Sequence, residues 1–263
     1  MPFKPTDPRL LDHAVAIARG AGAVIMPFFR QRDMEVHAKA DASPLTAADE
    51  AADVLITAAL RELTPAIPIV SEESSDQFGG IAPAGTFWLV DPLDGTREFI
   101  GGRDEFTVNI ALVKDGAPVL GVVFLPARNE MYAGAAGRGA LAIDDSGQHP
   151  IRCRLLPATG VIVAVSRSHG DRAADGALLA GMTVAGEVQA GSALKFCLVA
   201  SGQADAYPRA GRTMEWDTAA GQAVLMAAGG SIVDRHGHPL TYGKPGFENP
   251  SFVALGAFAL RSA

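Results

Sequence analysis

Residues 88–99 decide the fold prediction, and they read Trp88-Leu89-Val90-Asp91-Pro92-Leu93-Asp94-Gly95-Thr96-Arg97-Glu98-Phe99. The apolar run 87–90 predicts a buried strand that ends at Asp91, and Pro92 predicts a turn after it. Asp94-Gly95-Thr96 then opens a predicted helix, whose first N–H groups have no partner within the helix. Two carboxylates therefore meet a helix start that can bind an anion. On its own, the spacing Asp-x-x-Asp-Gly is also typical of a simple turn with a helix cap.

Two further groups of acids stand beside apolar segments. The run 67–70 predicts a strand, and Glu72-Glu73 follows it closely. Later, Glu215-Trp216-Asp217 begins a predicted helix, in which Asp217 could instead be a simple N-cap. Carboxylates suit hard cations such as Mg²⁺, and a site for two adjacent cations needs several of them. The three groups together predict metal-assisted phosphate chemistry.

Two helices are predicted before these strands. Apolar residues recur every three or four positions over residues 10–30, which predicts an amphipathic helix packed on a larger body. The second helix is predicted to begin after an N-cap at Thr46 and to end near Leu63. Asp49, three residues after Thr46, would be the acidic partner in a capping box.

An antiparallel sheet is predicted next. Its strands cover residues 106–113, 118–125, 131–135 and 140–143. Asp115-Gly116 predicts a tight hairpin turn between the first two of them. Asp144-Asp145-Ser146-Gly147 is predicted to break the sheet, which places a subdomain boundary near residue 150.

Helices and strands alternate beyond this boundary. The predicted strands cover residues 161–165, 204–207, 231–234 and 251–256, and the predicted helices cover 172–180, 192–200 and 216–228. This alternation is typical of an α/β unit. We therefore expect an α/β (α+β) fold with two subdomains. Residues 1–150 contain the first two groups of acids, and residues 151–263 contain the third.

Composition narrows the class of protein. The chain has 263 residues, of which 48% are hydrophobic and 19% charged, so disorder and a coiled coil are both excluded. A net charge of −7 leaves no broad basic face for a nucleic acid polymer. Two distant cysteines predict a reduced, cytoplasmic compartment. Prolines interrupt the first ten residues where an export signal would be apolar, and we expect no membrane-spanning segment.

Three of these segments resemble signatures of the Mg²⁺-dependent, Li⁺-sensitive phosphatases of the inositol monophosphatase superfamily. They are Ser71-Glu72-Glu73, Asp91-Pro92-Leu93-Asp94-Gly95-Thr96 and Trp216-Asp217-Thr218-Ala219-Ala220-Gly221. Longer stretches are similar to the bacterial CysQ-type 3′(2′),5′-bisphosphate nucleotidases of that superfamily: 39–41 with 43–49, Glu105–Leu112, Gly191–Cys197 and Tyr207-Pro208-Arg209. The similarity covers nearly the whole chain and implies a layered αβαβα sandwich.

The resemblance implies roles for the acids. Two or three Mg²⁺ ions per site would be held by the side chains of Glu72, Asp91, Asp94 and Asp217 and by the backbone carbonyl of Leu93. Asp49 and Thr96 would orient and deprotonate the attacking water, and the amides of Gly95 and Thr96 would hold the phosphate. Without the resemblance, Asp49 and Thr96 could equally be helix-capping residues.

The resemblance also implies which residues contact the nucleotide. They are His169, Ser192, Lys195 and Arg209. The three-residue spacing predicts that Ser192 and Lys195 share one face of a helix, and a guanidinium such as that of Arg209 suits a phosphate. Each of these residues taken alone could instead belong to a solvated charged rim.

The implied activity is Mg²⁺-dependent hydrolysis of adenosine 3′,5′-bisphosphate to AMP and phosphate, by direct attack of water, in sulfur assimilation. Hydrolysis of inositol 1-phosphate or another sugar monophosphate is an alternative, and so is a non-catalytic sensor of a metal-nucleotide complex. Ser192, Lys195 and Arg209 favour the nucleotide, because a neutral polyol needs no clamp for a second phosphate. We expect a cytoplasmic monomer or homodimer that could associate peripherally with the inner membrane.

Overall fold

The computed structural model describes residues 7–31, 44–167, 171–179 and 181–259. Within these residues the larger sheet has seven strands, which pair in chain order. They are β1 (Ile69–Ser71), β2 (Thr86–Asp94), β3 (Thr107–Lys114), β4 (Ala117–Leu125), β5 (Glu130–Ala135), β6 (Gly139–Asp144) and β7 (Gly147–Ile151). β1 runs parallel to β2, and the other neighbours are antiparallel.

Both faces of this sheet are buried, which explains its continuous apolar runs. On β2, Phe87 and Leu89 belong to one hydrophobic cluster, and Trp88 and Val90 belong to another. Successive side chains of a strand point to opposite faces, so one apolar run supplies two separate cores.

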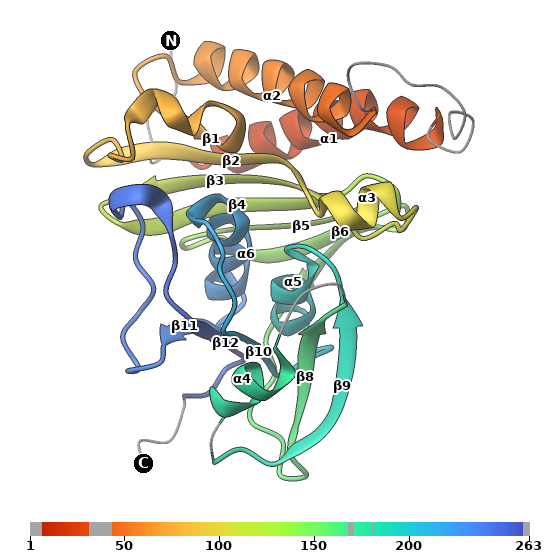
Figure 1. Cartoon of the computed structure of the whole chain (residues 1–263), viewed down its shortest axis with the longest axis vertical. Helices are drawn as coiled ribbons and strands as arrows, with labels where there is room; N and C mark the ends of the chain where they lie inside the picture. Colours follow the sequence, from red (N-terminus) through yellow and green to blue (C-terminus); the bar gives the residue numbers. More distant parts are fainter. Residues whose placement is uncertain (1–6, 32–43, 168–170, 180, 260–263) are drawn as a thin grey trace.

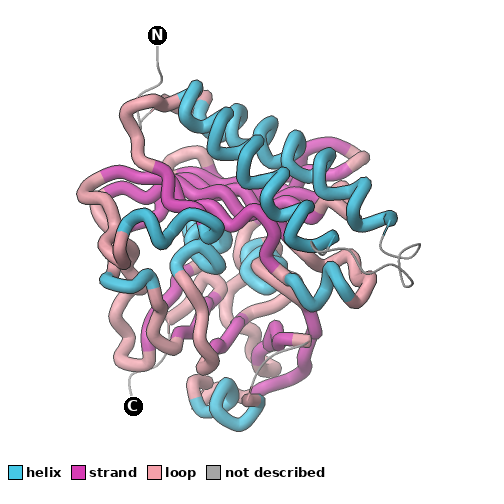
Figure 2. Tube along the Cα trace, turned by 45° about the horizontal axis from the view of Figure 1, so that its top comes forward, coloured by secondary structure: helices cyan, strands magenta, loops and turns pink. Residues whose placement is uncertain are grey.

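The first core lies between the sheet and two helices, α1 (Leu10–Gln31) and α2 (Pro44–Leu63). Figure 2 shows these helices side by side across the sheet. By length and composition alone, α1 is the described helix that could cross a membrane. Its face formed by Leu11, Ala14 and Ala18 is buried in the first core, which is how a core helix packs.

The smaller sheet belongs to the second half of the chain. Its strand order is β11 (Ser231–Asp234), β12 (Phe252–Leu255), β10 (Ala206–Arg209), β8 (Val161–Ser166) and β9 (Val184–Ala190). β8 is parallel to both β9 and β10, whereas β12 is antiparallel to β10 and β11.

Helices α5 (Leu194–Ala200) and α6 (Glu215–Ala227) lie between the two sheets, and α4 (Arg172–Ala177) lies beyond the smaller one (Figure 1). Shorter helices are α3 (Thr96–Ile100) and the 3₁₀ turns η1 (Glu72–Phe78) and η2 (Pro245–Phe247). The order of layers is thus helix, sheet, helix, sheet, helix. This order confirms the expected αβαβα sandwich.

A close approach fixes the position of α6 against the larger sheet. A Cβ atom added to Gly121 on β4 would lie 2.3 Å from the carbonyl oxygen of Ala220 on α6. Only glycine permits this spacing, so Gly121 sets how closely the helix packs on the strand. The start of α6 carries Asp217, which makes this packing relevant to the site.

Pro92 does not end its strand, contrary to the prediction. β2 continues to Asp94, and its register against β3 shifts between Asp91 and Asp94. Three residues on β2 span the distance that two residues span on β3, which is the geometry of a β-bulge. A bulge tolerates proline because it leaves a backbone position without a ladder hydrogen bond. The sequence signal for a turn therefore marked an irregularity within a strand.

The predicted break at residues 144–147 is also wrong. Asp144 and Gly147 pair with each other across a tight turn into β7, and the Asp144 carboxylate accepts a hydrogen bond from the Ser146 amide at 2.7 Å. β7 was missed because its residues are largely exposed and show no apolar pattern. β9 was missed for the same reason. The larger sheet ends at Ile151, and the division into subdomains at residue 150 stays a prediction.

Several helix boundaries differ from those predicted. α2 begins at Pro44, so Thr46 lies in its first turn and is not the N-cap; proline suits that turn because its φ is already helical. α4 ends at Ala177 and not at residue 180. α5 begins at Leu194, so Ser192 lies before the helix. The hairpin turn at Asp115-Gly116 is confirmed, with φ angles of 51° and 79°.

Candidate metal and phosphate site

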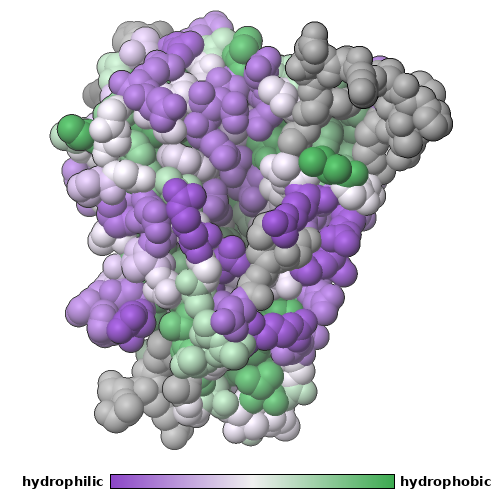
Figure 3. Space-filling model, in the orientation of Figure 1, coloured by the Kyte–Doolittle hydropathy of each residue, from purple (hydrophilic) through white to green (hydrophobic). Residues whose placement is uncertain are grey.

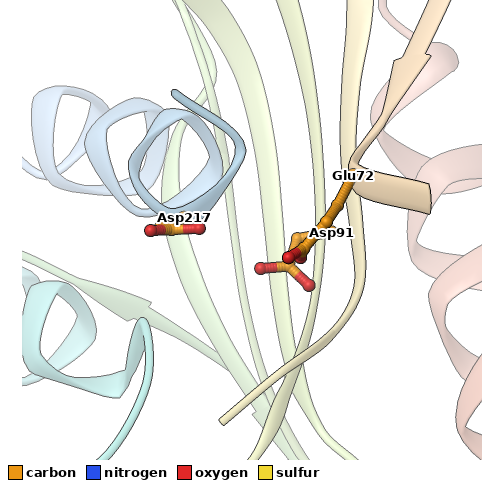
Figure 4. Close-up of side chains that lie close together, drawn as sticks. All are labelled: Glu72, Asp91 and Asp217. Atoms are coloured by element: carbon orange, nitrogen blue, oxygen red, sulfur yellow. The ribbon is translucent and has the colours of Figure 1, made fainter. Parts of the chain in front are cut away.

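Three carboxylates from three different elements converge. Glu72 begins η1, Asp91 lies on β2, and Asp217 lies in the first turn of α6. Each offers an oxygen atom, and these atoms lie within 4.8 Å of one another. Figure 4 shows Glu72 beside Asp91, with Asp217 facing them from the start of α6. Three carboxylate oxygens this close together could hold a cation.

The pairing of β1 with β2 explains why Glu72 and Asp91 are neighbours. Ser71 pairs with Val90 in this parallel register, so the residues that follow them, Glu72 and Asp91, come next to each other. Asp217 arrives from the other half of the chain. It is the third residue of α6, and its Oδ2 accepts a hydrogen bond from the amide of the N-cap Met214 at 2.8 Å. Asp217 therefore caps the start of α6 through the Met214 amide and also faces the cluster.

Mutual repulsion and burial change the acidity of these groups. Burial, together with Glu72 and Asp94, holds the pKa of Asp91 well above its usual value. Burial of its carboxylate and the charge of Asp94 raise the pKa of Glu72 to about 7. The same two causes raise the pKa of Asp217 to about 7. A cation among the carboxylates would offset both effects, so this donor set fits a divalent metal ion.

Asp94 stands next to this group and is held firmly. Its Oδ2 accepts a hydrogen bond from the Ala193 amide at 2.8 Å, and its backbone carbonyl accepts one from Ser192 Oγ at 2.9 Å. Burial raises the pKa of Asp94, while nearby Lys195 lowers it. Leu93 is buried, and its amide donates to Asp91 Oδ1 at 3.1 Å. The predicted roles of Asp94 and of the Leu93 carbonyl as ligands stay predictions.

Asp49 lies at the edge of the same acidic cluster. It is not the capping-box partner that the sequence suggested, because α2 begins before Thr46 and the Asp49 carboxylate lies against Glu73. Burial and the charges of Glu73 and Glu72 raise the pKa of Asp49 to about 8. Its Oδ1 is buried and has no hydrogen-bond partner among the described residues. The predicted pairing of Asp49 with Thr96 stays a prediction.

Gly95 connects β2 to α3 in a conformation that suits glycine. Its φ is 98°, and a Cβ atom there would lie 2.1 Å from Ser192 Oγ. A larger residue would be strained in its backbone and would collide with Ser192. Thr96 is the first residue of α3 and is exposed. The binding of a phosphate by the Gly95 and Thr96 amides stays a prediction.

A cavity of about 380 Å³ opens beside the carboxylates. Its walls contain most of the residues predicted to bind substrate, which are Gly95, Thr96, Ser192, Lys195 and Arg209. The predicted metal ligands Asp94 and Asp217 line it as well. Arg97 and Arg212 also line it, and neither was predicted as a site residue from the sequence. On the face drawn in Figure 3, hydrophilic residues predominate and the surface is hollowed near its centre.

Ser192 and Lys195 do not share a helix face, contrary to the prediction. Ser192 precedes α5 and has a positive φ of 47°. Lys195 is 4% exposed, which excludes a solvated rim, and its Nζ donates to the Ser192 carbonyl at 2.6 Å. Burial lowers the pKa of Lys195 to about 8. His169, also predicted to contact the nucleotide, lies outside the described residues.

Glu215, to which the sequence assigned no role, lies beside the site. It is fully buried, and its carboxylate accepts hydrogen bonds from the amides of Gly243 and Lys244, each at 2.8 Å. The Lys244 ammonium lies 2.7 Å from it. Glu215 therefore ties a distant loop to the start of α6, next to Asp217. In the sequence, this role could have been suspected because Glu215 is an acid at the start of an otherwise apolar helix.

Comparisons with family models, curated proteins and solved structures all identify the same family. The model of the inositol monophosphatase family matches residues 7–258. The chain is 46% identical to the 3′(2′),5′-bisphosphate nucleotidase CysQ of Escherichia coli strain K12 over 248 residues, which cover 92% of this chain and 98% of that one. The corresponding protein of Buchnera aphidicola is 38% identical, with 95% and 93% covered.

Two solved structures have the same fold over almost their full length. CysQ from Bacteroides thetaiotaomicron, described as a bacterial member of the inositol monophosphatase family, superposes with a TM-score of 0.83 at 35% identity, covering 97% of this chain and 100% of that one. Mycobacterium tuberculosis SuhB superposes with a TM-score of 0.73 at 28% identity, covering 96% and 93%.

Proposed function

The chain belongs to the inositol monophosphatase family, and we propose that it is a 3′(2′),5′-bisphosphate nucleotidase that converts adenosine 3′,5′-bisphosphate to AMP and phosphate. The names of its relatives with 38–47% identity support this substrate. One structural observation carries the chemistry. Asp217 belongs both to the carboxylate group and to the wall of a cavity that contains Lys195 and Arg209.

Glu72, Asp91 and Asp217 would hold Mg²⁺, with Asp94 and the Leu93 carbonyl as the further ligands of a site for two or three ions. When bound, Mg²⁺ supplies positive charge that acidifies water and offsets the negative charge developing on phosphate oxygens. The carboxylates come from both halves of the chain, so the fold assembles the site in advance.

Asp49 is the group suited to accept a proton from the attacking water. Its Oδ1 is buried and has no hydrogen-bond partner among the described residues, so this oxygen could accept a proton from water. Thr96, at the start of α3, would orient the same water. Because water attacks phosphorus directly, the reaction needs no side-chain nucleophile and forms no covalent enzyme intermediate.

The remaining cavity residues bind the substrate. The amides of Gly95 and Thr96 would hold the phosphate that is cleaved. Arg209 would bind the second phosphate, because a guanidinium can donate two parallel hydrogen bonds to it, and His169 would add a further contact. Ser192 and Lys195 line the same cavity. A polyol monophosphate has no second phosphate to pair with the Arg209 guanidinium. Arg209 therefore favours a nucleoside bisphosphate as the substrate.

An assay panel tests the proposed substrate. With Mg²⁺ present, phosphate release from adenosine 3′,5′-bisphosphate should greatly exceed release from inositol 1-phosphate. The opposite ranking would assign the protein to the sugar phosphatases of the family. Binding of adenosine 3′,5′-bisphosphate without any turnover would instead make it a sensor.

The partner is a small molecule, and a net charge of −7 gives no reason to expect a nucleic acid polymer. The expected location is the cytoplasm, as a monomer or homodimer. The expected Li⁺ sensitivity, the role in sulfur assimilation and the peripheral contact with the inner membrane come from the family resemblance.

A further inference from the structure

Glu105 is a buried acid that the mechanism above does not use. It lies between α3 and β3 and is 5% exposed. Its Oε2 accepts hydrogen bonds from the Gly191 amide at 2.9 Å and from Arg167 Nε at 3.0 Å. Its Oε1 accepts from Arg167 Nη2 at 2.9 Å and from Arg128 Nη2 at 3.2 Å. Both oxygens are therefore committed to N–H donors, and Glu105 is no candidate metal ligand.

Through these contacts, Glu105 holds the end of β9 and the turn that follows it. Arg167, held by Glu105, donates from its Nη2 to the Gln189 carbonyl at 3.1 Å and from its amide to the Ala190 carbonyl at 3.3 Å. The next residue, Gly191, donates directly to Glu105. The Arg167 guanidinium and the Glu105 carboxylate thus hold the backbone at Gln189 and Gly191, and the Arg167 amide holds the Ala190 carbonyl between them.

The turn Gly191–Ala193 also holds Asp94. Ser192 Oγ donates to the Asp94 carbonyl at 2.9 Å, and the Ala193 amide donates to Asp94 Oδ2 at 2.8 Å. Ser192 does so from a left-handed conformation, with φ at 47°, which costs free energy in a residue other than glycine. Such a conformation persists only when its surroundings fix it, and the contact of Glu105 with Gly191 is next to it in the chain.

We propose that Glu105 is a positioning residue, which orients the Asp94 carboxylate toward the cation by fixing the turn Gly191–Ala193. The inference rests on the proposed function, since Asp94 is a ligand only if the carboxylates bind a metal ion. Glu105 and Asp94 lie on the side of the larger sheet, and the turn lies on the side of the smaller sheet. The contacts therefore also join the two halves around the site.

A purely structural role is the competing explanation, and the chain contains a matched control for it. Asp205 is fully buried and accepts two hydrogen bonds from Arg154, at 2.6 and 2.7 Å, and one from the Ile162 amide at 2.6 Å. This is the same chemistry of a buried carboxylate with one arginine fork and one backbone amide. None of these three residues lines the cavity of the site.

The test compares Glu105→Gln with Asp205→Asn. A glutamine at position 105 has one oxygen and one NH₂ group in place of two acceptor oxygens. Whichever way the amide is turned, its NH₂ group faces N–H donors, and the hydrogen bonds on that side are lost. Mg²⁺ binding is measured without substrate, from the rise in unfolding temperature as Mg²⁺ is added. The Mg²⁺ concentration for half-maximal hydrolysis of adenosine 3′,5′-bisphosphate is measured separately.

Both variants should unfold at lower temperature than the wild type in the absence of metal. Only Glu105→Gln should need more Mg²⁺, by about tenfold, as is common when a group that orients a metal ligand is lost. An unchanged Mg²⁺ requirement in Glu105→Gln, or an equal rise in Asp205→Asn, would overturn the proposal. If the wild type binds Mg²⁺ but does not hydrolyse this nucleotide, the proposed substrate is wrong, and the binding measurement still tests the role of Glu105.

Arg167→Lys keeps the test available if Glu105→Gln does not fold. The Arg167 side chain is 34% exposed, so the substitution should be tolerated, and lysine keeps the charge while losing the fork. An Mg²⁺ requirement for Arg167→Lys that lies between those of the wild type and Glu105→Gln supports the proposal. A folded Arg167→Lys protein with wild-type Mg²⁺ binding would contradict it.

Discussion

Asp217 combines two roles in one side chain. One carboxylate oxygen accepts a hydrogen bond from the Met214 amide, and an oxygen of the same group lies within 4.8 Å of ligand atoms of Glu72 and Asp91. Asp217 is not the N-cap that the sequence allowed, because Met214 holds that position and Asp217 accepts its hydrogen bond from the third position of α6. The role of Asp217 as a metal ligand stays a prediction. The capping bond holds the side chain where a cation would need it.

We predict that Asp217→Asn keeps the fold but weakens Mg²⁺ binding by at least about tenfold, since losing even an outer partner of a metal ligand commonly costs that much. Asparagine can still accept the Met214 hydrogen bond, and it removes the repulsion with Asp94 that contributes to raising the pKa of Asp217. Metal-free stability at pH 8 should therefore not fall. Calorimetric titration with Mg²⁺ and thermal unfolding measure the two effects.

Asp171→Asn is the matched control. Asp171 caps α4 through the amides of Ala173 and Ala174, and asparagine is a comparable N-cap. Its Mg²⁺ affinity should equal that of the wild type. Wild-type Mg²⁺ affinity in Asp217→Asn as well would remove Asp217 from the metal site.

At the scale of elements, the position of α6 decides whether the site can form. The helix contacts β2, β3 and β4, and its first turn carries Asp217 toward the end of β2. Gly121 on β4 sets how closely the helix approaches, while Glu215 holds the neighbouring loop at its start. Packing along the body of the helix thus determines the geometry at its tip.

We predict that Gly121→Ala destabilises the protein by about 1–3 kcal/mol, the usual cost of overpacking a core. The added methyl group would lie 2.3 Å from the Ala220 carbonyl oxygen, and this backbone atom can move away only if α6 shifts. Hydrolysis should fall as well, because the shift displaces Asp217. Urea unfolding and steady-state assays measure the two changes.

Gly186→Ala on β9 provides the comparison within a strand, because a Cβ atom there has no neighbour within 4 Å. Its stability and activity should stay near those of the wild type. A Gly121→Ala protein that behaves like Gly186→Ala would show that α6 is not held by this contact.

At the scale of the whole molecule, the two halves of the chain bring together acids that repel one another. Glu72 and Asp91 come from the larger sheet and its first turn, and Asp217 comes from the second half. Repulsion among these acids therefore lowers the stability of the folded state until a cation binds. Metal binding and global stability should be linked for this reason.

We predict that the metal-free protein loses stability as the pH rises from about 4 to about 8. Burial and neighbouring acids raise the folded-state pKa values of Glu72 and Asp217 to about 7 and that of Asp49 to about 8, whereas unfolded carboxyls titrate near 4. In this range the folded state binds more protons than the unfolded state, so removing protons favours unfolding. Thermal unfolding in a chelator measures the effect.

Mg²⁺ should reverse this trend, because it binds the deprotonated carboxylates. Its addition should raise the unfolding temperature more at pH 8 than at pH 6, by an amount that grows with the logarithm of its concentration. An equal rise at both pH values would contradict the assignment of these acids as ligands.

Patterns within short stretches of the sequence predicted the local features. The acids beside apolar runs, the hairpin at Asp115-Gly116 and the amphipathic pattern of α1 depend on residues a few positions apart, and the layered fold followed from the family resemblance. Segments whose side chains are mostly exposed, such as β7 and β9, gave no such signal. Pro92 misled because a bulge and a turn share the same local chemistry.

Long-range packing determines which groups meet. It brought Asp217 to Glu72 and Asp91, buried Lys195 against the Ser192 carbonyl, and placed Glu105 behind the turn that holds Asp94. These contacts join residues that are far apart in the chain, and their distances depend on how closely two sheets and the helices between them pack. No pattern within a short window contains that information, since packing is settled by shape across the whole core.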